Sequence, residues 1–241
     1  SSIIIADVGN HCVHRIALPS GEPLPVLSGT GSEGLSYPRA VTVLENSSST
    51  SGGASPFDVR LPERLLCVAD AGNARVQTYD AATLAHVKSI GKQADGLTKD
   101  GESRIHIAGE LEQPIAVCAH GRELFVVDGF QHRVSVFDGL SGRFLRSFGG
   151  RGKEAGQMQS PFGCIVVRGL LVVSEATRLQ VFNIEGECLH VFELPDARDL
   201  AGLCGDDARG LLYCADYSRG CVYKLRIGWE HVGDPMSVAI E

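Results

Sequence analysis

The sequence predicts an all-β protein folded as a β-propeller, and three observations support this. A short apolar run that ends in a polar residue occurs five times, at Ile3–Asp7, Leu65–Asp70, Leu124–Asp128, Leu170–Ser174 and Leu211–Asp216. The polar stops lie 63, 58, 46 and 42 residues apart, a spacing that is typical of repeated structural units. The runs are apolar at every position, as expected of strands that are covered on both faces. The repeats carry strand patterns and no amphipathic helix pattern, which favours a propeller over a solenoid.

Each repeat has the strands of a propeller blade. Gly, Asp and Ser residues supply the turn dihedrals that divide Leu124–Gly150 into three strands, Leu124–Val127, Arg133–Phe137 and Phe144–Phe148. A further strand, usually opened by proline, precedes the apolar run in four repeats, and proline at the first residue of a strand removes no ladder hydrogen bond. These opening strands are Tyr37–Leu44, Gln113–Ala119, Ser160–Val167 and Asp199–Cys204.

The first repeat has no opening strand, because the chain begins almost directly at Ile3. Asp234–Glu241 has the pattern of an opening strand with nothing after it. We therefore expect the C-terminal strand to enter the first blade and close a ring of five four-stranded blades, with residues 1–241 as a single domain. Such closure would remove exposed sheet edges, which promote aggregation.

A family resemblance follows from the residues around the arginines of the repeat. The pattern of an apolar residue, Val, Asp, four residues, Arg–Val, two residues and Phe–Asp resembles the NHL repeat, and Asp70–Asp80 is a close match. Gly149–Gly152 with Gln157–Pro161 resembles the family's linker between blades. The resemblance covers nearly the whole chain, although Cys12 and Cys221 replace the arginine in the first and fifth repeats. Propellers of this family often have six blades, which is the alternative to the five counted here.

The repeated acid and arginine have a structural interpretation. Asp70 with Arg75, and Asp128 with Arg133, recur in more than one repeat, whereas catalytic residues rarely recur with a blade period. We expect each pair to hold the turn between two strands.

Composition restricts the partners. The chain of 241 residues has a net charge of −7, which argues against a nucleic-acid or anionic-membrane surface as its dominant property. No apolar run approaches the roughly 20 residues that span a bilayer, so we expect no membrane contact. Oligomeric state is left open.

The cysteines and histidines predict neither disulfides nor metal. None of the eight cysteines forms a C-x-x-C pair or a zinc-like grouping, so we expect reduced thiols and a cytoplasmic, intracellular protein. Asn10–Arg15 holds two histidines and a cysteine. Because His11 and His14 lie three apart, they would face opposite sides of a strand, and we expect ordinary turn and surface residues. No cofactor and no bound metal is predicted.

A partner-binding face is predicted from the turns. Large or charged side chains stand in exposed turns on one side of the propeller, and Tyr and Arg are favoured at binding hot spots. The candidates are Phe130, His132, Tyr217 and Arg219 in the turns, Arg151 and Lys153 in the Gly149–Lys153 segment, and Arg104 in the long loop Gly91–Gln113. We predict a non-catalytic scaffold that binds a protein partner there. The resemblance implies the same, since many NHL propellers are interaction domains of larger proteins, including ubiquitin ligases.

Two alternatives stay open. Some NHL propellers bind single-stranded RNA, and Arg104, Arg151, Lys153 and Arg219 would then have to converge on one face. The chain is also similar, at the level of the repeat, to peptide-amidating lyase propellers, which hold a metal with histidines around the central channel. Here no histidine recurs at an equivalent inner-strand position, and no G-x-S-x-G or H-E-x-x-H motif is present, so no catalytic residue is assigned.

Overall fold

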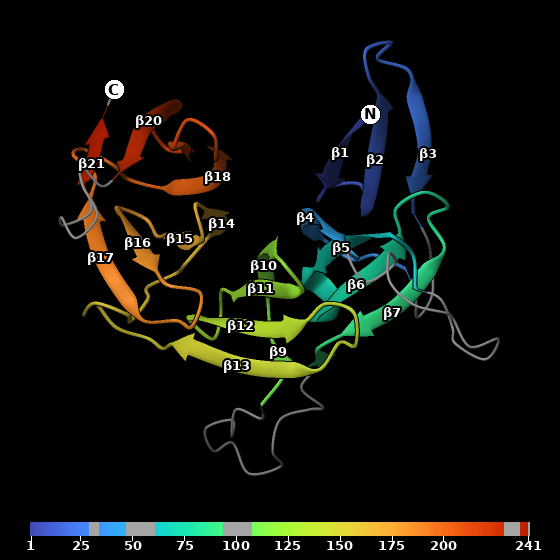
Figure 1. The fold of residues 1–241 in the computed structure, drawn as a ribbon, viewed down its shortest axis with the longest axis horizontal. Helices are drawn as coiled ribbons and strands as arrows, with labels where there is room; N and C mark the ends of the chain where they lie inside the picture. Colours follow the sequence, from blue (N-terminus) through green and yellow to red (C-terminus); the bar gives the residue numbers. More distant parts are fainter. Residues whose placement is uncertain (29–33, 47–60, 94–107, 229–236, 241) are drawn as a thin grey trace.

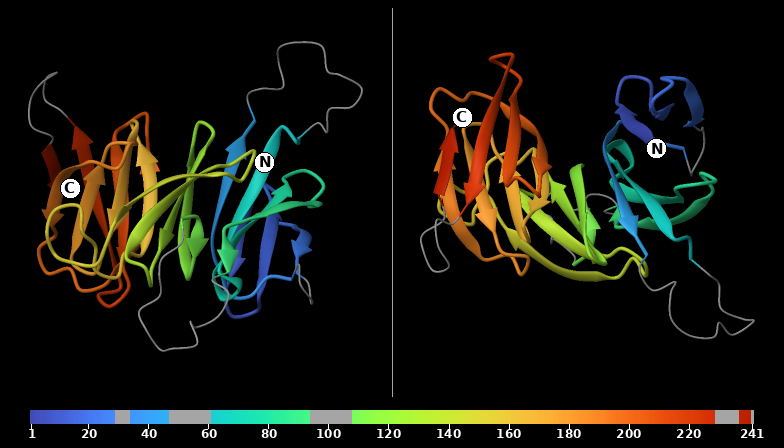
Figure 2. Two further views of the ribbon diagram at one scale, coloured as in Figure 1. Left: turned by 90° about the horizontal axis from the view of Figure 1, so that it is seen from below. Right: turned by 45° about the horizontal axis from the view of Figure 1, so that its top comes forward.

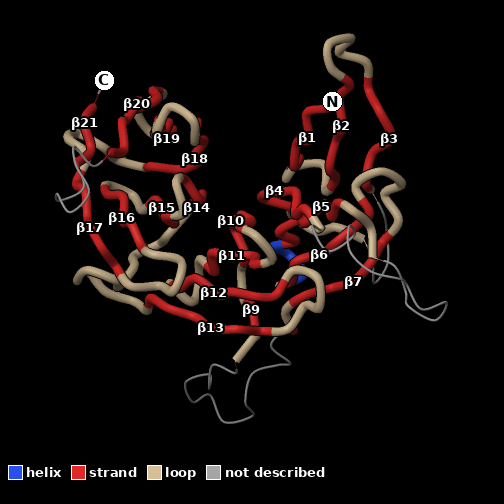
Figure 3. The backbone as a smooth tube through the Cα atoms, in the orientation of Figure 1, coloured by secondary structure: helices blue, strands red, loops and turns tan. Residues whose placement is uncertain are grey.

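Five antiparallel sheets follow one another in chain order around a central axis (Figure 1). The structure, a computed structural model, describes residues 1–28, 34–46, 61–93, 108–228 and 237–240. Within them the only helical element is one 3₁₀ turn, Ala71–Asn73, and each of the five apolar runs is a strand (Figure 3). The predicted all-β propeller with five blades is confirmed.

Blades 2 to 5 each have four strands in sequential order, and blade 1 has three. Blade 1 contains β1 (Ser2–Asp7), β2 (Cys12–Ala17) and β3 (Pro23–Leu27). Blade 2 contains β4 (Pro38–Glu45), β5 (Arg64–Asp70), β6 (Arg75–Asp80) and β7 (His86–Ile90). Blade 3 contains β10 (Pro114–His120), β11 (Glu123–Asp128), β12 (Arg133–Asp138) and β13 (Phe144–Gly149).

Blade 4 contains β14 (Gly163–Val167), β15 (Leu170–Ser174), β16 (Arg178–Phe182) and β17 (Cys188–Glu193). Blade 5 contains β18 (Leu200–Asp206), β19 (Leu211–Asp216), β20 (Cys221–Gly228) and β21 (Ser237–Ile240). A short parallel pair, β8 (Lys92–Gln93) with β9 (Glu110–Leu111), lies on the connection between blades 2 and 3. The expected four-stranded unit is therefore present in four of the five blades.

The predicted closure by the C-terminal strand is wrong. β21 pairs with β20, with Leu225 opposite Ile240, and it completes blade 5 instead of blade 1. The free edge of β20 is only eight residues away along the chain, and a short connection has a lower loop-closure cost than a crossing to blade 1. Blades 1 and 5 consequently stand at the two ends of an open arc (Figures 1 and 2). Cys12 and Cys221 are therefore in the two end blades and not in neighbouring ones.

The core lies between successive blades. One cluster joins blades 2 and 3 through residues such as Leu65 and Phe137, and similar clusters join blades 1 and 2, 3 and 4, and 4 and 5. The second strand of blade 2 is buried from Leu65 to Asp70, as the unbroken apolar run predicts. By contrast, β1 at the end of the arc alternates, and its Ile3 and Ile5 are exposed.

All eight cysteines are free thiols. Burial raises the pKa of both Cys67 and Cys214 to about 12. Cys204 and Cys221 are exposed.

Thiol labelling should separate these classes. With an aromatic disulfide reagent at neutral pH we expect Cys204 and Cys221 to react first, and Cys67 and Cys214 to react only after unfolding, because the thiolate is the reacting form. Peptide mass spectrometry after brief labelling identifies the modified cysteines. Rapid modification of Cys67 in the folded protein would contradict the described packing.

Candidate partner-binding face

One edge of the propeller, here called the loop face, carries the turn from the second to the third strand in blades 2 to 5 and the equivalent turn from β1 to β2 in blade 1. The segment that leads into each opening strand reaches the same edge, because the first and second strands are antiparallel. The backbone amides of these segments need hydrogen-bond partners, since an unpaired buried N–H costs free energy. Side chains at the ends of the second strands supply those partners.

In blade 2 the repeated acid and arginine hold the incoming segment. The Asp70 carboxylate accepts hydrogen bonds from the backbone N–H of Ser36 at 2.6 Å and from Arg75 Nε at 2.9 Å. Arg75 Nη2 donates to the Gly34 carbonyl at 3.0 Å. The side chain of Asp70 is fully buried, and Arg75 retains 17% exposure. The predicted structural role of this pair is confirmed, and its contacts extend beyond the turn to the crossing between blades.

Blade 3 repeats the arrangement. Asp128 accepts from the backbone N–H groups of Glu112 at 2.8 Å and Gln113 at 2.9 Å, and Arg133 Nη2 donates to the Glu110 carbonyl at 2.8 Å. Burial lowers the pKa of the Arg133 guanidinium, and the charges of Asp128 and Glu110 oppose that effect. The carboxylate and the guanidinium thus hold the same four-residue segment, 110–113, from two sides.

Blades 4 and 5 reach the same result with different residues. In blade 4 Ser174 stands at the acid position, and the next residue, Glu175, accepts from the Gln159 N–H at 2.6 Å and from Arg178 Nε at 3.0 Å. In blade 5 Asp216 accepts from the backbone N–H groups of Arg198 at 2.9 Å and Arg219 at 3.0 Å. Glu175 lies one residue after the position of the acid in the other repeats, so alignment of the repeats at that position does not identify it.

Histidines in two of the turns fasten the following blade. His11 Nδ1 accepts from the Tyr37 N–H at 3.0 Å, and His132 Nδ1 accepts from the Ser160 N–H at 3.1 Å. Both histidines have a left-handed backbone, with φ of 55° and 53°. Burial, followed by the charge of Arg151, lowers the pKa of His132. His132, predicted to bind a partner, therefore has a structural contact that the sequence did not indicate, and His11 lies in a turn and not on a strand.

Exposed aromatic side chains gather on the loop face. Four aromatic residues are exposed among the described residues, and all four lie at turns or at the starts of opening strands on this edge. They are Tyr37 (52%), Phe130 (62%), Phe162 (40%) and Tyr217 (82%). Phe130 therefore faces mainly solvent. Tyr37 and Phe162 were missed, although each adjoins a proline that opens a strand.

A pocket of about 510 Å³ lies on this face at blade 3. Phe130, His132 and Arg151 line it together with Ser147–Gly149 of β13. Lys153 is exposed in the same inter-blade segment, where its carbonyl accepts from Arg178 Nη1 at 2.5 Å. Three predicted site residues are thus brought together in one pocket.

The other predicted residues are elsewhere. Tyr217 and Arg219 belong to blade 5, and blade 4 stands between them and the pocket. Arg219 Nη1 donates to the Asp196 carbonyl at 3.1 Å and approaches the Asp196 carboxylate at 3.7 Å. Arg104 lies outside the described residues, as does most of its loop. A larger cavity of about 720 Å³ lies between blades 1 and 2 at the opposite edge, lined by Arg15 and Arg64, and the sequence singled out neither residue.

This geometry defines a β-propeller with an aromatic loop face. No family model matches the chain. A stretch of 68 residues, 28% of the chain, is 41% identical to RING finger protein nhl-1 of Caenorhabditis elegans, and the match spans only 7% of that protein.

Solved structures show the same fold at low identity. The β-propeller domain of Cps50 (Swd1) from Myceliophteria thermophila aligns over 100% of this chain and 67% of that one, with a TM-score of 0.62 and 10% identity. Hydrazine synthase of Kuenenia stuttgartiensis aligns over 93% of this chain and 61% of its own, with a TM-score of 0.58 and 12% identity. At these identities the likeness is one of fold alone. No helix in the described part of the chain is both long and apolar enough to cross a membrane.

The clamp at blade 2 should carry a large share of stability. Arg75→Ala would leave the buried Asp70 carboxylate without its main charge partner, so we expect a loss of about 3–5 kcal/mol in the free energy of unfolding. The matched control is Arg64→Ala, since the Arg64–Glu45 pair is more than half exposed on both sides and should change stability by at most about 1 kcal/mol. Urea denaturation measures both, and equal effects would disprove the clamp.

The His132 contact should make stability depend on pH. The pKa of His132 is lower in the folded state than in the unfolded state, where it is about 6.5. The stabilisation of the folded state by neutral His132 is therefore complete above about pH 6.5, and it is lost as the pH falls from there to the pKa of the folded state. His132→Asn tolerates the left-handed backbone and removes this titration. We expect a flatter decline in unfolding free energy between about pH 7.5 and pH 5 in the variant than in the wild type. His120→Asn, at the exposed end of β10, is the control, and parallel profiles for wild type and His132→Asn would contradict the assignment.

Proposed function

We propose that this chain is a non-catalytic scaffold of the NHL type that binds a protein partner on its loop face. The observation that carries the proposal is the gathering of Tyr37, Phe130, Phe162 and Tyr217 at one edge of the propeller. Exposed aromatic side chains are large, rigid contact surfaces, and they are enriched at binding hot spots. The pocket formed by Phe130, His132 and Arg151 is the proposed centre of the contact.

Two further observations support the scaffold over its alternatives. The acids and arginines of the repeat bind backbone groups at the crossings into blades 2, 3 and 4, so they act as structural residues and not as a catalytic pair. Single-stranded RNA binding would use Arg151, Lys153, Arg219 and Arg104, and the charge of Arg219 is already opposed by the Asp196 carboxylate at 3.7 Å. The match to RING finger protein nhl-1 is consistent with an NHL-type interaction module. Free thiols at all eight cysteines support the proposed intracellular location.

A comparative pull-down tests the proposed face. We expect Phe130→Ala combined with Tyr217→Ala to reduce recovery of partner proteins at least tenfold, because truncation of a hot-spot aromatic typically costs about 2 kcal/mol or more. The matched control is Val26→Ala with Leu189→Ala, which removes exposed apolar side chains from the outer strands β3 and β17. Recovery of the same partners by both double variants would reject the loop face.

The same preparation distinguishes RNA binding. An RNA contact would be lost with Arg151→Ser and Lys153→Ser, and it would weaken steeply with salt, because counterions are released on phosphate binding. A protein partner held mainly by the aromatic residues should show a weak salt dependence, and with this pair of substitutions it should lose only the Arg151 contact in the pocket.

A further inference from the structure

Asp7 in blade 1 lacks the partners that its equivalents have in the other blades. In blades 2, 3 and 5 the acid at the end of the second strand accepts backbone N–H groups from the segment that enters its own blade. Among the described residues no segment donates a backbone N–H to Asp7 in this way, and the sheet of blade 1 contains only β1, β2 and β3. Its carboxylate instead accepts from the backbone N–H and the side-chain Nδ2 of Asn10, at 3.0 and 2.8 Å.

The arginine of the repeat is also replaced. Asp7 pairs with Cys12 across β1 and β2, in the register in which Asp70 pairs with Arg75 and Asp128 with Arg133. Cys12 and His14 are two residues apart on β2, so their side chains share one face of the sheet. The sequence analysis considered only whether His11 and His14 lie on the same side of a strand. It did not consider Cys12, which is the residue on the same side as His14.

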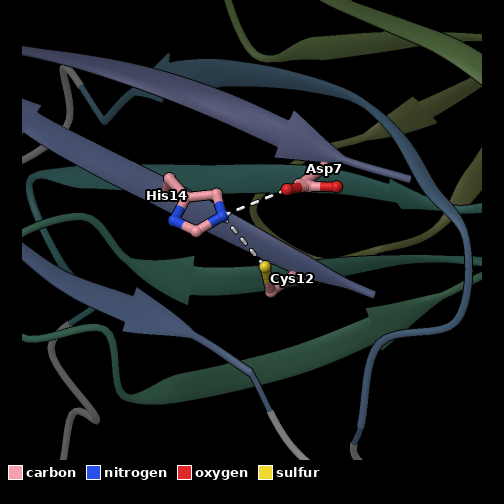
Figure 4. Close-up of side chains that lie close together, drawn as sticks. All are labelled: Asp7, Cys12 and His14. Atoms are coloured by element: carbon pink, nitrogen blue, oxygen red, sulfur yellow. Dashed lines mark hydrogen bonds and ion pairs between the residues drawn. The ribbon is translucent and has the colours of Figure 1, made fainter. Parts of the chain in front are cut away.

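Three potential metal ligands therefore converge at the loop face (Figure 4). His14 Nε2 lies 3.2 Å from Cys12 Sγ and 3.2 Å from Asp7 Oδ2. The donor atoms of all three residues lie within 4.8 Å of one another, and this is the one such group among the described residues. One proton on His14 Nε2 can form a hydrogen bond with either Cys12 Sγ or Asp7 Oδ2. A cation between the three atoms would bind all of them at once.

We propose that Asp7, Cys12 and His14 form a zinc site with three protein ligands and one open position. Tetrahedral Zn²⁺ with bonds of about 2.0–2.3 Å to N, O and S separates its ligand atoms by about 3.3–3.6 Å, so small side-chain rotations accommodate the ion. A thiolate, an imidazole and a carboxylate together favour Zn²⁺ over Mg²⁺ or Ca²⁺, which prefer oxygen ligands alone. Asn10 donates to both oxygens of Asp7 and orients the carboxylate as an outer-shell partner.

Access and specificity agree with this assignment. Cys12 is buried, while the side chains of Asp7 and His14 are 28% and 43% exposed, so an ion can reach the group from solvent. Blade 5 provides an internal comparison, because Cys221 occupies the same repeat position. There the residue two positions further on is Tyr223, and Asp216 is bound by backbone N–H groups of Arg198 and Arg219, so the third ligand is missing.

Calorimetric titration of the full chain with Zn²⁺, after reduction and removal of metal by a chelator, tests the site. We expect the wild type to bind one zinc ion with high affinity, and Cys12→Ser, His14→Gln and Asp7→Asn each to lose at least about tenfold in affinity. Cys221→Ser is the matched control and should bind as the wild type does. Equal binding by wild type and Cys12→Ser, or loss of binding in Cys221→Ser alone, would overturn the proposal.

Cobalt provides a readout that does not depend on the variants' folding. The wild type loaded with Co²⁺ should show a thiolate-to-cobalt charge-transfer band and the intense visible bands of four-coordinate cobalt. Circular dichroism establishes that each variant is folded before its titration is interpreted. A folded wild type that shows no thiolate-to-cobalt band on addition of Co²⁺ would overturn the assignment of Cys12.

Discussion

The fold depends on how the chain is held where it passes from one blade to the next. Each crossing places backbone N–H groups at the loop face, and an unpaired buried N–H would destabilise the crossing. The acid of the blade being entered accepts those hydrogens, as Asp70 does for Ser36 and Glu175 for Gln159. At two crossings a histidine of the preceding blade, His11 or His132, accepts from the adjacent residue. Neighbouring blades are thus joined by polar contacts at one edge as well as by apolar packing between their sheets.

The two blades at the ends of the arc differ in their number of strands. β21 completes blade 5, and blade 1 keeps only three strands, so β1 remains an edge with exposed Ile3 and Ile5. Among the described residues Asp7 binds Asn10 and His14 and not an incoming segment, so its contacts differ from those of its equivalents. The end of the arc is therefore the place where the repeat departs most from its own pattern, and it is where Cys12 and His14 meet the acid.

Most of the architecture could be predicted from the sequence because strands buried on both faces leave unbroken apolar runs, as in Leu65–Asp70. The destination of the last strand could not, since a short apolar segment such as Ser237–Ile240 fits any free antiparallel edge, and only chain connectivity and packing choose among them. The sequence analysis did not predict the grouping of Asp7 with His14, because it depends on the register of β1 and β2. In that register Asp7 pairs with Cys12, and His14, two residues further along β2, lies on the same face of the sheet as Cys12. Glu175 was also missed, because it performs the role of the repeat's acid from the position that follows Ser174.

Within the turns, the residues that hold the crossings differ from those that face solvent, so the proposed binding surface can vary without loss of the fold. Asp128 and Arg133 flank the turn Gly129–His132 and form hydrogen bonds with the segment that enters blade 3. His132, the last residue of the turn, accepts a hydrogen bond from the segment that enters blade 4, whereas Phe130 projects into solvent. In blade 5 Asp216 holds the incoming segment, and the adjacent Tyr217 is the most exposed of the large apolar or aromatic side chains in the described part of the chain. Substitution at the tips therefore alters the surface without removing a contact on which the crossings depend. Binding specificity in this propeller is accordingly expected at the turn tips, and stability at the residues that flank them.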